Sequence, residues 1–318
     1  MLAIGERHLI ITITPNASID RTYTIPGFGV DRIHRPDECR VVAGGKGVNV
    51  ARVLKELGQP ALATGFVGGH YGDVISRCLD EEGIRHDFVR VEGESRLCLK
   101  IMDPTNGTQT EINETGPEVR ADEIDAMLAK LADLLPAARF VVLCGSCPPG
   151  VPVSFYGEII KLASKAGVKS VLDTSGDHLA VAIKASPYMV KPNVAELSQL
   201  AGRELCTLEE ISGAAKSLKQ YGVEVTSVTM GRSGAMVTDG VQAWQAVPPE
   251  IQFASAVGSG DSFLAGFLDS LVGGEPLGDA LAWGTAAGAA NATTYCAGCC
   301  SKESIIEIRQ GTVLSKIS

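Results

Sequence analysis

The sequence has little of what marks a nucleic-acid-binding protein. Among its 318 residues, 28 are Lys or Arg and 37 are Asp or Glu, so the formal net charge is −9. General nucleic-acid binding depends on neutralising phosphates with Lys and Arg, and this charge balance argues against it. The balance leaves room for a small anionic ligand, because a local cluster of cations can outweigh the overall sign.

Long apolar runs are also missing. The least polar long segment, residues 281–295, is dominated by Ala and Gly and includes one Asn and three Thr, which is typical of a tightly packed helix and not of a membrane span. The first ten residues carry Glu6, Arg7 and His8 and lack the layout of a signal peptide. We therefore expect a cytoplasmic protein without membrane contact.

Nine cysteines are scattered along the chain. Cys296, Cys299 and Cys300 form the only tight group, which resembles half a zinc site but has no second Cys/His pair at a suitable spacing. We expect reduced thiols there. Cys144 and Cys147 flank a strand end immediately before a proline, and we interpret them as small residues in packing and not as a redox pair.

From about residue 120, strand-like runs alternate with helical segments. The continuous run 140–143 predicts a strand buried on both faces, and a helix-length segment follows from 153 to 166. Further units follow in the same order: strand 171–173, helix 176–185, strand 188–190, helix 208–221 and strand 225–230. Repeated strand–helix–strand units imply parallel strands with right-handed crossovers, and so an α/β sandwich.

Two stretches, 18–42 and 87–114, interrupt this rhythm. Both alternate in the manner of strands joined by turns, and neither can form a core alone. We expect them to pair as a small β-sheet lid. The α/β body would then consist of residues 1–17, 43–86 and 115–318.

The stretch Gly258-Ser259-Gly260-Asp261 precedes the apolar run 262–268. Two glycines let backbone N–H groups approach a ligand, and the N-terminus of a following helix favours an anion. A carboxylate next to an anion site is useful if it accepts a proton, which suggests phosphoryl transfer to a hydroxyl with Asp261 as the base. An Asp behind an ordinary glycine turn is the plainer alternative.

A second glycine-rich loop, Gly44-Gly45-Lys46-Gly47, opens a helix that carries Asn49. Backbone N–H groups and a cation would meet a ligand here, and the Asn49 amide offers both a donor and an acceptor to sugar hydroxyls. The spacing differs from that of a Walker A loop, and no G-x-G-x-x-G follows the first strand. A mobile turn with a solvated lysine is the alternative.

Asp20 follows the first strand, where a carboxylate suits a grip on two sugar hydroxyls. A turn aspartate is equally compatible with this position. Arg35, Lys46 and Arg96 lie in or beside the lid segments and together would suit a phosphate already present on the substrate.

Asn193 and Glu196 share one side of the first turn of a predicted helix. They would anchor a hydrated Mg²⁺ near nucleotide phosphates, or form a capping box, and the two roles are compatible. The turn that contains Thr229, Gly231 and Gly234 suits a nucleotide contact, although the pattern is weak by itself.

Taken together, these motifs resemble a known family. The loop that begins at Gly44 resembles the first signature of the PfkB-type carbohydrate kinases of the ribokinase-like superfamily, and the stretch 256–262 is similar to their second signature. Further matches at 145–150, 173–176 and 191–197 follow in the family's order over nearly the whole chain. Residues 109–118 resemble the subgroup that holds 1-phosphofructokinase and tagatose-6-phosphate kinase.

The resemblance implies a ribokinase-like three-layer α/β/α sandwich with a mostly parallel central sheet and a small β-sheet lid. It also implies ATP and Mg²⁺ as cofactors, with Glu196 reaching the metal through water, and a homodimer formed through the lid.

Family positions match a catalytic base at Asp261 and an anion hole at Gly258, Ser259 and Gly260. They match substrate contacts at Asp20, Gly44, Gly45, Lys46, Asn49, Arg96 and Arg35. They match nucleotide contacts at Lys191, Asn193, Glu196, Thr229, Gly231, Gly234 and Asn291. The family usually has Leu where this chain has Cys147, and often Ala where it has Ser259.

The expected reaction is phosphorylation of a ketohexose monophosphate by ATP. Fructose 1-phosphate is the first candidate and tagatose 6-phosphate the second, with fructose 6-phosphate or an unphosphorylated sugar or nucleoside as alternatives. The cations around Arg96 argue against an unphosphorylated substrate. A non-catalytic sugar-phosphate sensor is the alternative from another class, and we expect such a protein to have lost the base or the anion loop, both of which are present.

Overall fold

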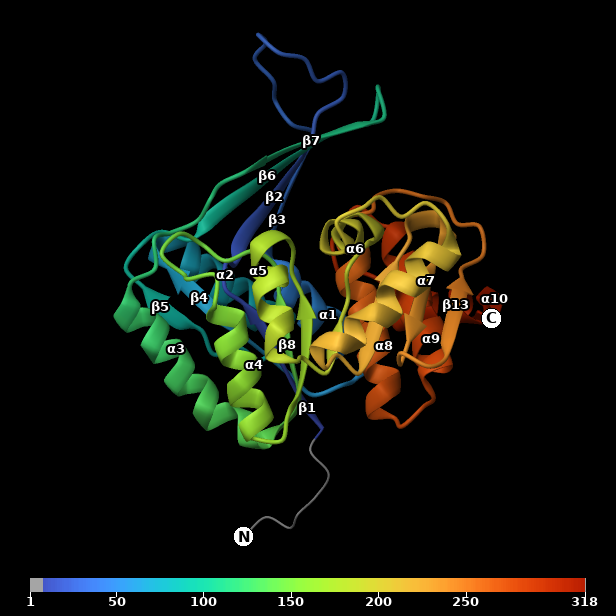
Figure 1. Ribbon diagram of the computed structural model, residues 1–318. Coiled ribbons are helices and arrows are strands. Elements are labelled where there is room, and N and C mark those ends of the chain that lie inside the picture. The colour runs from blue at the N-terminus through green and yellow to red at the C-terminus, as the bar shows by residue number, and fades with distance from the viewer. Residues whose placement is uncertain (1–7, 318) are drawn as a thin grey trace.

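A computed structural model describes residues 8–317, so the first seven residues of the expected body lie outside it. The described chain forms two sheets (Figure 1). A ten-stranded sheet has the order β14-β13-β12-β11-β10-β9-β8-β1-β4-β5 and is covered by helices. A four-stranded sheet has the order β3-β2-β6-β7 and extends away from the helical layers.

The elements have the following bounds. The large sheet contains β1 (Leu9–Thr14), β4 (Ala61–Gly68), β5 (Val89–Val91), β8 (Ala138–Cys144), β9 (Lys169–Asp173), β10 (Met189–Val190), β11 (Val225–Thr229), β12 (Ala235–Thr238), β13 (Ala243–Val247) and β14 (Val313–Ile317). The small sheet contains β2 (Ser18–Thr24), β3 (Glu38–Gly44), β6 (Arg96–Asp103) and β7 (Thr108–Asn113). The helices are α1 (Lys46–Leu57), α2 (Gly69–Glu82), α3 (Ala121–Leu134), α4 (Phe155–Lys165), α5 (Gly176–Ala182), α6 (Val194–Ala201), α7 (Leu208–Ser217), α8 (Ser259–Val272), α9 (Leu277–Ala292) and α10 (Lys302–Gly311). Short 3₁₀ turns are η1 (Leu135–Ala137), η2 (Ile183–Ala185), η3 (Leu218–Tyr221) and η4 (Gly231–Ser233).

The large sheet separates two apolar cores. In β8, Phe140 and Val142 pack into the core that lies under α1, α2, α8, α9 and α10. Val141 and Leu143 pack into the other core, under α3 to α7. Because successive side chains of a strand point to opposite faces, a strand buried on both faces needs an unbroken apolar run. This confirms the sequence-based prediction for 140–143.

In the large sheet, the neighbouring strands β5, β4, β1, β8, β9, β10 and β11 all pair in parallel. The pairs β11–β12, β12–β13 and β13–β14 at its other end are antiparallel. A parallel pair needs a long crossover, but β11 and β12 are joined only by residues 230–234, which include the 3₁₀ turn η4. This short connection reverses the chain and gives the sheet its antiparallel end.

The structure changes two bounds of the sequence-based lid segments. β5 falls within the stretch 87–114, but it pairs in parallel with β4 of the large sheet, and its Val89 and Val91 side chains are buried. The second segment of the small sheet therefore starts at Arg96. The first extends to Gly44, where β3 ends.

The Ala- and Gly-rich segment is the helix α9, which packs along α8. At Gly288, a Cβ atom would lie 3.0 Å from the carbonyl oxygen of Ser259, so the small residues let α9 approach the first turn of α8. Within residues 8–317, none of the helices has the length and apolar character needed to cross a membrane.

Candidate active site

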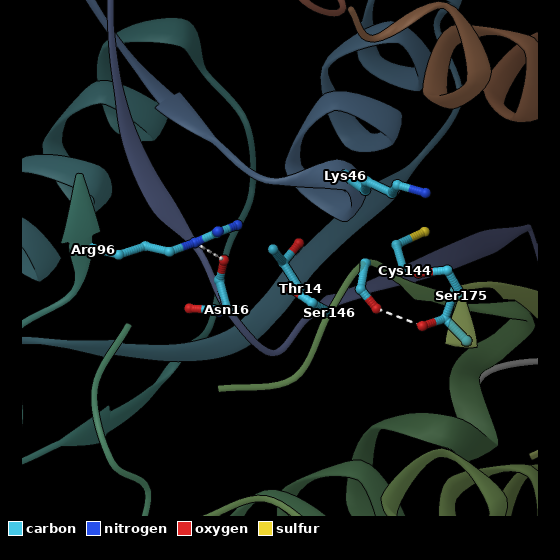
Figure 2. Close-up of a pocket in the computed structure, with 9 residues that line it drawn as sticks. Thr14, Asn16, Lys46, Arg96, Cys144, Ser146 and Ser175 are labelled. Atoms are coloured by element: carbon cyan, nitrogen blue, oxygen red, sulfur yellow. Dashed lines mark hydrogen bonds between the residues drawn. The ribbon is translucent and has the colours of Figure 1, made fainter. Parts of the chain in front are cut away.

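A cavity of about 230 Å³ opens at the carboxyl ends of β1, β8 and β9 (Figure 2). Ligands of open α/β sheets bind at this edge. The residues that line the cavity are Thr14, Asn16, Lys46, Arg96, Cys144, Gly145, Ser146, Thr174 and Ser175. Of these, the sequence motifs predicted Lys46 and Arg96 as site residues. The other seven lie at strand ends or just beyond them, which is one signal that could have found them; four of them also lie within the family matches at 145–150 and 173–176.

The predicted anion turn forms the start of α8. Gly258 occupies the N-cap with a φ of 81°, a left-handed conformation that favours glycine. A Cβ atom at this position would lie 2.7 Å from Ala297, so the turn also packs too closely for a side chain. The backbone N–H groups of the first turn of α8 have no partners within the helix, although that of Ser259 donates to the carbonyl oxygen of Ala256 at 3.2 Å. Such a helix N-terminus favours an anion.

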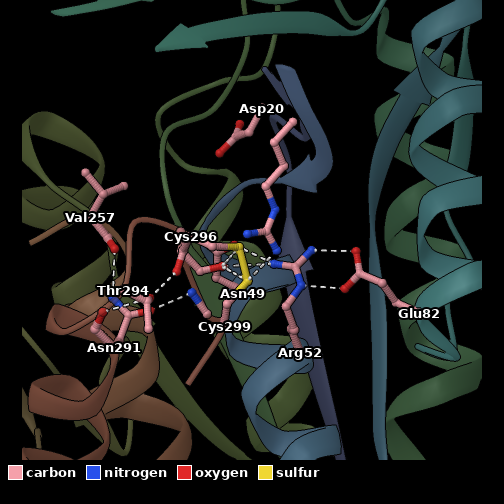
Figure 3. Close-up of a disulfide and its surroundings, with 12 residues drawn as sticks. Asp20, Asn49, Arg52, Glu82, Val257, Asn291, Thr294, Cys296 and Cys299 are labelled. Carbon is pink, nitrogen blue, oxygen red and sulfur yellow. Dashed lines mark hydrogen bonds and ion pairs between the residues drawn. A yellow bond between two sulfur atoms is a disulfide. The ribbon is translucent and has the colours of Figure 1, made fainter. Parts of the chain in front are cut away.

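Asn291 of α9 holds this turn in place (Figure 3). Its Nδ2 donates to the carbonyl oxygen of Val257 at 2.8 Å and to Ser259 Oγ, and its Oδ1 accepts from the backbone N–H of Gly298 at 2.7 Å. The residue is completely buried. Asn291 therefore supports the glycine turn through hydrogen bonds inside the protein, and the nucleotide contact that the family resemblance implied stays a prediction.

Asp261, in the first turn of α8, is 5% exposed. One carboxylate oxygen accepts a hydrogen bond of 2.8 Å from Asn49 Nδ2. Burial and the neighbouring Asp173 raise the pKa of Asp261 to about 6, against the smaller lowering effects of Lys46, Asn49 and Lys191. At pH 7 such a carboxylate is ionised and basic enough to accept a proton from a hydroxyl.

Asp173, at the end of β9, joins two lysines to this centre. Its Oδ1 lies 3.2 Å from Lys46 Nζ and 3.3 Å from Lys191 Nζ, and the residue is 1% exposed. Burial alone would raise the pKa of Asp173, but the two ammonium groups hold it below its ordinary value. In turn Asp173 raises the pKa of Lys46. The sequence motifs did not single out Asp173 as a site residue.

Lys191 also reaches the anion turn, since its Nζ lies 3.4 Å from the position of a Cβ atom at Gly260. Two ammonium groups, the N-terminus of α8 and a buried carboxylate therefore lie close together. Cations and helix N-termini stabilise phosphoryl oxygens, and a nearby carboxylate can receive a proton. This combination suits phosphoryl transfer to a hydroxyl group.

The glycine loop lies between the small sheet and α1. Gly44 packs directly against the carboxylate of Asp20, and Gly45, with a φ of 110°, packs against the Thr14 side chain, so neither position has room for a Cβ atom. Asp20 Oδ1 accepts a hydrogen bond of 2.7 Å from Ser18 Oγ. The structure thus brings together the predicted sugar-binding residues Asp20, Gly44 and Gly45.

Lys100 of β6 was missed by the sequence motifs. Its Nζ lies 3.7 Å from Asp20 Oδ2, and the side chain is buried. In β6, Cys98 and Lys100 are buried on one face, whereas Leu97 and Leu99 on the other face are partly exposed. Near the body both faces of the small sheet are covered, because Ile19 and Ala43, in the same cross-strand row as Leu97, belong to the apolar core.

Arg96 lines the cavity together with Lys46, and its Nε donates to the carbonyl oxygen of Asn16 at 3.1 Å (Figure 2). Arg35 is placed differently. It is exposed in the loop between β2 and β3, which projects away from the body (Figure 1), and it is not among the residues that line the cavity. The structure therefore does not bring Arg35 together with Arg96 and Lys46 within one chain.

Asn193 and Glu196 form the predicted capping box at the start of α6. Asn193 Oδ1 accepts from the Glu196 backbone N–H at 2.9 Å, and Glu196 Oε2 accepts from the Asn193 backbone N–H at 2.9 Å. The negative charge of Glu196 contributes to the raised pKa of Lys46, so it acts on the same centre. Among residues 8–317 no cluster of three or more His, Cys, Asp or Glu side chains could hold a metal ion alone.

The predicted nucleotide turn lies beside this capping box. Asn193 forms a parallel bridge with Thr229, and Gly231 and Gly234, with φ angles of 59° and 79°, bound the 3₁₀ turn that follows. The backbone therefore places the residues of these two motifs next to each other, at the carboxyl ends of β10 and β11.

The cysteines also need a correction. We expected reduced thiols at Cys296 and Cys299, but the structure joins them in a disulfide (Figure 3). The turn between them brings their Cα atoms to 5.4 Å, within the range that a disulfide bridges. Cys144 and Cys147 are free.

The comparisons with known proteins agree with this geometry. The model of the pfkB family of carbohydrate kinases matches residues 11–303. The chain is 38% identical over 278 residues to a 1-phosphofructokinase of Rhodobacter capsulatus, covering 87% of this chain and 88% of the relative. It is 36% identical over 285 residues to a 1-phosphofructokinase of Borreliella burgdorferi, covering 89% and 92%.

Solved structures agree as well. Phosphofructokinase-2 from Escherichia coli in complex with fructose-6-phosphate superposes with a TM-score of 0.89 at 28% identity, covering 95% of this chain and 98% of that one. The tetrameric inhibited form of the same protein gives a TM-score of 0.88 at 29% identity, with the same coverage of both chains. These likenesses confirm the ribokinase-like α/β fold, with its large, mostly parallel sheet and its small separate sheet.

Proposed function

The chain belongs to the pfkB family of carbohydrate kinases and is a phosphotransferase that acts on a sugar hydroxyl; we propose that its substrate is fructose 1-phosphate, which it converts with ATP to fructose 1,6-bisphosphate and ADP. One observation carries this proposal most directly. The buried carboxylate of Asp261 lies at the N-terminus of α8 beside Lys46, which lines the same cavity as Arg96.

In this proposal Asp261 is the base. It accepts the proton of the free primary hydroxyl while that oxygen attacks the γ-phosphorus of ATP. The backbone N–H groups of Gly258, Ser259 and Gly260 stabilise the equatorial oxygens of the transferring group. The ammonium group of Lys191, which reaches this turn, adds positive charge at the same place.

The sugar phosphate would lie between the body and the small sheet, for which we propose the role of a lid. Asp20 and the backbone of Gly44 and Gly45 would bind its hydroxyls, and Arg96 would bind the phosphate already present. Lys46 would lie between the bound phosphate and the reacting hydroxyl, since it lines the cavity and its charge lowers the pKa of Asp261. Closure of the lid would exclude water, which competes with the sugar as the acceptor.

ATP and Mg²⁺ fit the remaining residues. In the capping box Glu196 uses one carboxylate oxygen, so the other remains for a magnesium-bound water. Mg²⁺ in kinases takes few protein ligands and is completed by phosphates and water, which agrees with a site that lacks a cluster of ligands. When bound, the metal neutralises charge on the phosphates. Asn193, Lys191, Thr229, Gly231 and Gly234 would contact the nucleotide.

A kinetic panel tests the substrate. We expect ATP-dependent turnover to be fastest with fructose 1-phosphate, lower with tagatose 6-phosphate and fructose 6-phosphate, and lowest with fructose. Each ketohexose phosphate presents a phosphate at one end and a free primary hydroxyl at the other, so C4 configuration and ring orientation must discriminate among them. A higher kcat/KM with tagatose 6-phosphate or fructose 6-phosphate would overturn the substrate assignment.

A variant of the base tests the mechanism. Asp261→Asn should lower kcat by about a thousandfold or more, while fructose 1-phosphate binds with an affinity close to that of the wild type. Measuring binding by calorimetry separates the two effects. A variant that keeps more than about a tenth of the wild-type kcat would exclude Asp261 as the base.

We also propose that the protein forms a homodimer through the lid. Val30 and Ile33, in the loop between β2 and β3, are 87% and 90% exposed. Val41 and Ile112 are also exposed, and they lie in one cross-strand row of the small sheet on the face opposite Lys100. A second copy would cover both sets of side chains. Sedimentation of the wild type and of Ile33→Glu checks this: we expect a dimer that the charge weakens, and a wild-type monomer would contradict it.

A further inference from the structure

Arg52 lies one turn after Asn49 in α1 and is only 8% exposed. Its guanidinium group is surrounded by hydrogen-bond acceptors from four parts of the chain (Figure 3). Nη1 donates to Asn49 Oδ1 at 2.9 Å and to the carbonyl oxygen of Ala297 at 3.3 Å. Nη2 donates to the carbonyl oxygen of Ala43 at 2.7 Å, and Nε and Nη2 both bind the carboxylate of Glu82 in α2.

The contact with Asn49 determines how its amide is oriented. An asparagine amide has one acceptor end and one donor end. Because Arg52 can only donate, it binds Oδ1 of Asn49, and Nδ2 is then directed at Asp261, to which it donates at 2.8 Å. If the amide were reversed, its oxygen would face the carboxylate of Asp261 and its NH₂ group would face a cation.

We propose that Arg52 is a positioning residue for the catalytic base: it holds the amide of Asn49 in the one orientation that donates to Asp261. The inference builds on the role proposed above for Asp261. It adds a buried residue that does not touch the carboxylate itself and that none of the motif arguments assigned to the site.

The other contacts of Arg52 serve the same geometry. Ala43 immediately precedes the glycine loop, and Ala297 packs against Gly258 in the anion turn. One planar guanidinium group therefore joins the residue before the glycine loop, the residue that packs against the turn, and Asn49, which donates to Asp261. A lysine has a single ammonium group and could not bind these separate acceptors and Glu82 together.

The charges around Asp261 and Arg52 determine in which direction the pKa of Asp261 should move when Arg52 is replaced. Asp261 is affected by Asp173 from β9, which raises its pKa, and by Lys46 of α1 and Lys191 after β10, which lower it. The hydrogen bond from Asn49 also lowers this pKa. Arg52 itself is paired with Glu82 of α2. Loss of the Asn49 donor should therefore move the titration of Asp261 to higher pH.

The test is a carbon-13 NMR titration of the Asp261 carboxyl in the substrate-free protein, because it does not depend on turnover. We compare the wild type with Arg52→Lys and Arg52→Gln. Lys55→Gln is the control, since Lys55 is another cation of α1, it contacts the backbone of Glu82, and no hydrogen bond or ion pair joins it to Asn49. Arg52→Lys keeps the positive charge but removes the guanidinium group. Lys55→Gln removes a positive charge from α1 but leaves the guanidinium group of Arg52 in place.

We expect both Arg52 variants to raise the midpoint of Asp261 by about half a pKa unit or more, and Lys55→Gln to leave it unchanged. Arg52→Lys should also lower kcat at pH 7 by about tenfold, with the KM for ATP within about twofold of the wild type. An unchanged midpoint in Arg52→Lys, or an equal shift in Lys55→Gln, would overturn the proposal. So would an Arg52→Lys protein that does not fold, because Arg52 would then be chiefly structural.

The result for Arg52 can be distinguished from a failure of the base assignment at Asp261. If Asp261→Asn keeps its activity, the base assignment is wrong, whatever Arg52 does. If Asp261→Asn is inactive and the midpoint in Arg52→Lys equals that of the wild type, the base assignment stands and the role of Arg52 falls.

Discussion

Lys46 Nζ lies 3.2 Å from Asp173 Oδ1, although 127 residues separate the two in the chain. This ion pair joins the first turn of α1 to the end of β9. Lys191 Nζ lies 3.3 Å from the same oxygen, so one buried carboxylate holds two ammonium groups next to the anion turn. Removing one partner of a buried pair leaves charge without compensation, which costs more than the pair itself gains.

Asp173→Asn should therefore destabilise the protein by about 3 kcal/mol, measured by urea unfolding at pH 7. It should also move the acidic limb of kcat/KM to lower pH, because the charge of Asp173 raises the pKa of Asp261. Asp177→Asn, at an exposed position in α5, serves as the control and should change neither quantity. An acidic limb that moves to higher pH would contradict the electrostatic coupling.

The raised pKa of Asp261 has a consequence for stability. In the folded protein this pKa is about 6, above the ordinary 3.8, so between these values the folded state binds more protons than the unfolded state. Stability contributed by Asp261 is complete below pH 3.8 and is lost as the pH rises through about 6. Asp261→Asn should then stabilise the protein by about 1–3 kcal/mol at pH 8 and by little at pH 4. Urea unfolding at both pH values checks this, and an equal gain at both would refute it.

Arg96→Ala should act on one substrate only. Loss of a charged hydrogen bond to phosphate costs about 1.5–3 kcal/mol, so we expect the KM for the sugar phosphate to rise by about 10- to 100-fold. The KM for ATP should stay within about twofold. Arg90→Ala, which removes an exposed arginine of β5 outside the cavity, is the control. Equal effects of Arg96→Ala on both KM values would exclude a role restricted to the sugar phosphate.

Gly258→Ala should damage both stability and catalysis. Its left-handed φ and the approach of Ala297 leave no room for a methyl group, and we expect a loss of about 2–4 kcal/mol with a fall in kcat. Gly107→Ala provides the comparison, because Gly107 has a φ of 64° but no atom within 4 Å of its added Cβ. Gly107→Ala introduces backbone strain alone, whereas Gly258→Ala adds a steric clash with Ala297. Thermal unfolding and initial rates of the two variants measure the difference. Similar values for the two variants would show that packing against Ala297 is unimportant.

Much of the site could be predicted from the sequence because its parts are local. The turn that begins at Gly258 and the capping box of Asn193 and Glu196 each depend on residues within one turn of a helix. Such a pattern specifies its own conformation, and the structure has the capping box as predicted. The alternation of strands and helices likewise predicted the layers of the body, because each strand had to be buried on both faces.

What the sequence could not supply is contact between distant residues. Nothing near Asp173 indicates that two lysines meet it, since Lys46 comes from another element far along the chain. Asn291 was assigned to a ligand by resemblance, but its burial depends on how α9 packs beneath the turn. The burial of Lys100 depends on which face of the small sheet meets the body, and the alternation in β6 is compatible with either.

Strand β3 continues into α1 with Gly45 as the only residue between them. Transplanting the small sheet of a relative into this chain would therefore also replace the glycine loop that begins at Gly44, and Lys46 with it. The safer splice point is the turn at Gly107 between β6 and β7, where an added Cβ meets nothing within 4 Å. Insertions for tethering or labelling belong at that turn, away from the glycine loop.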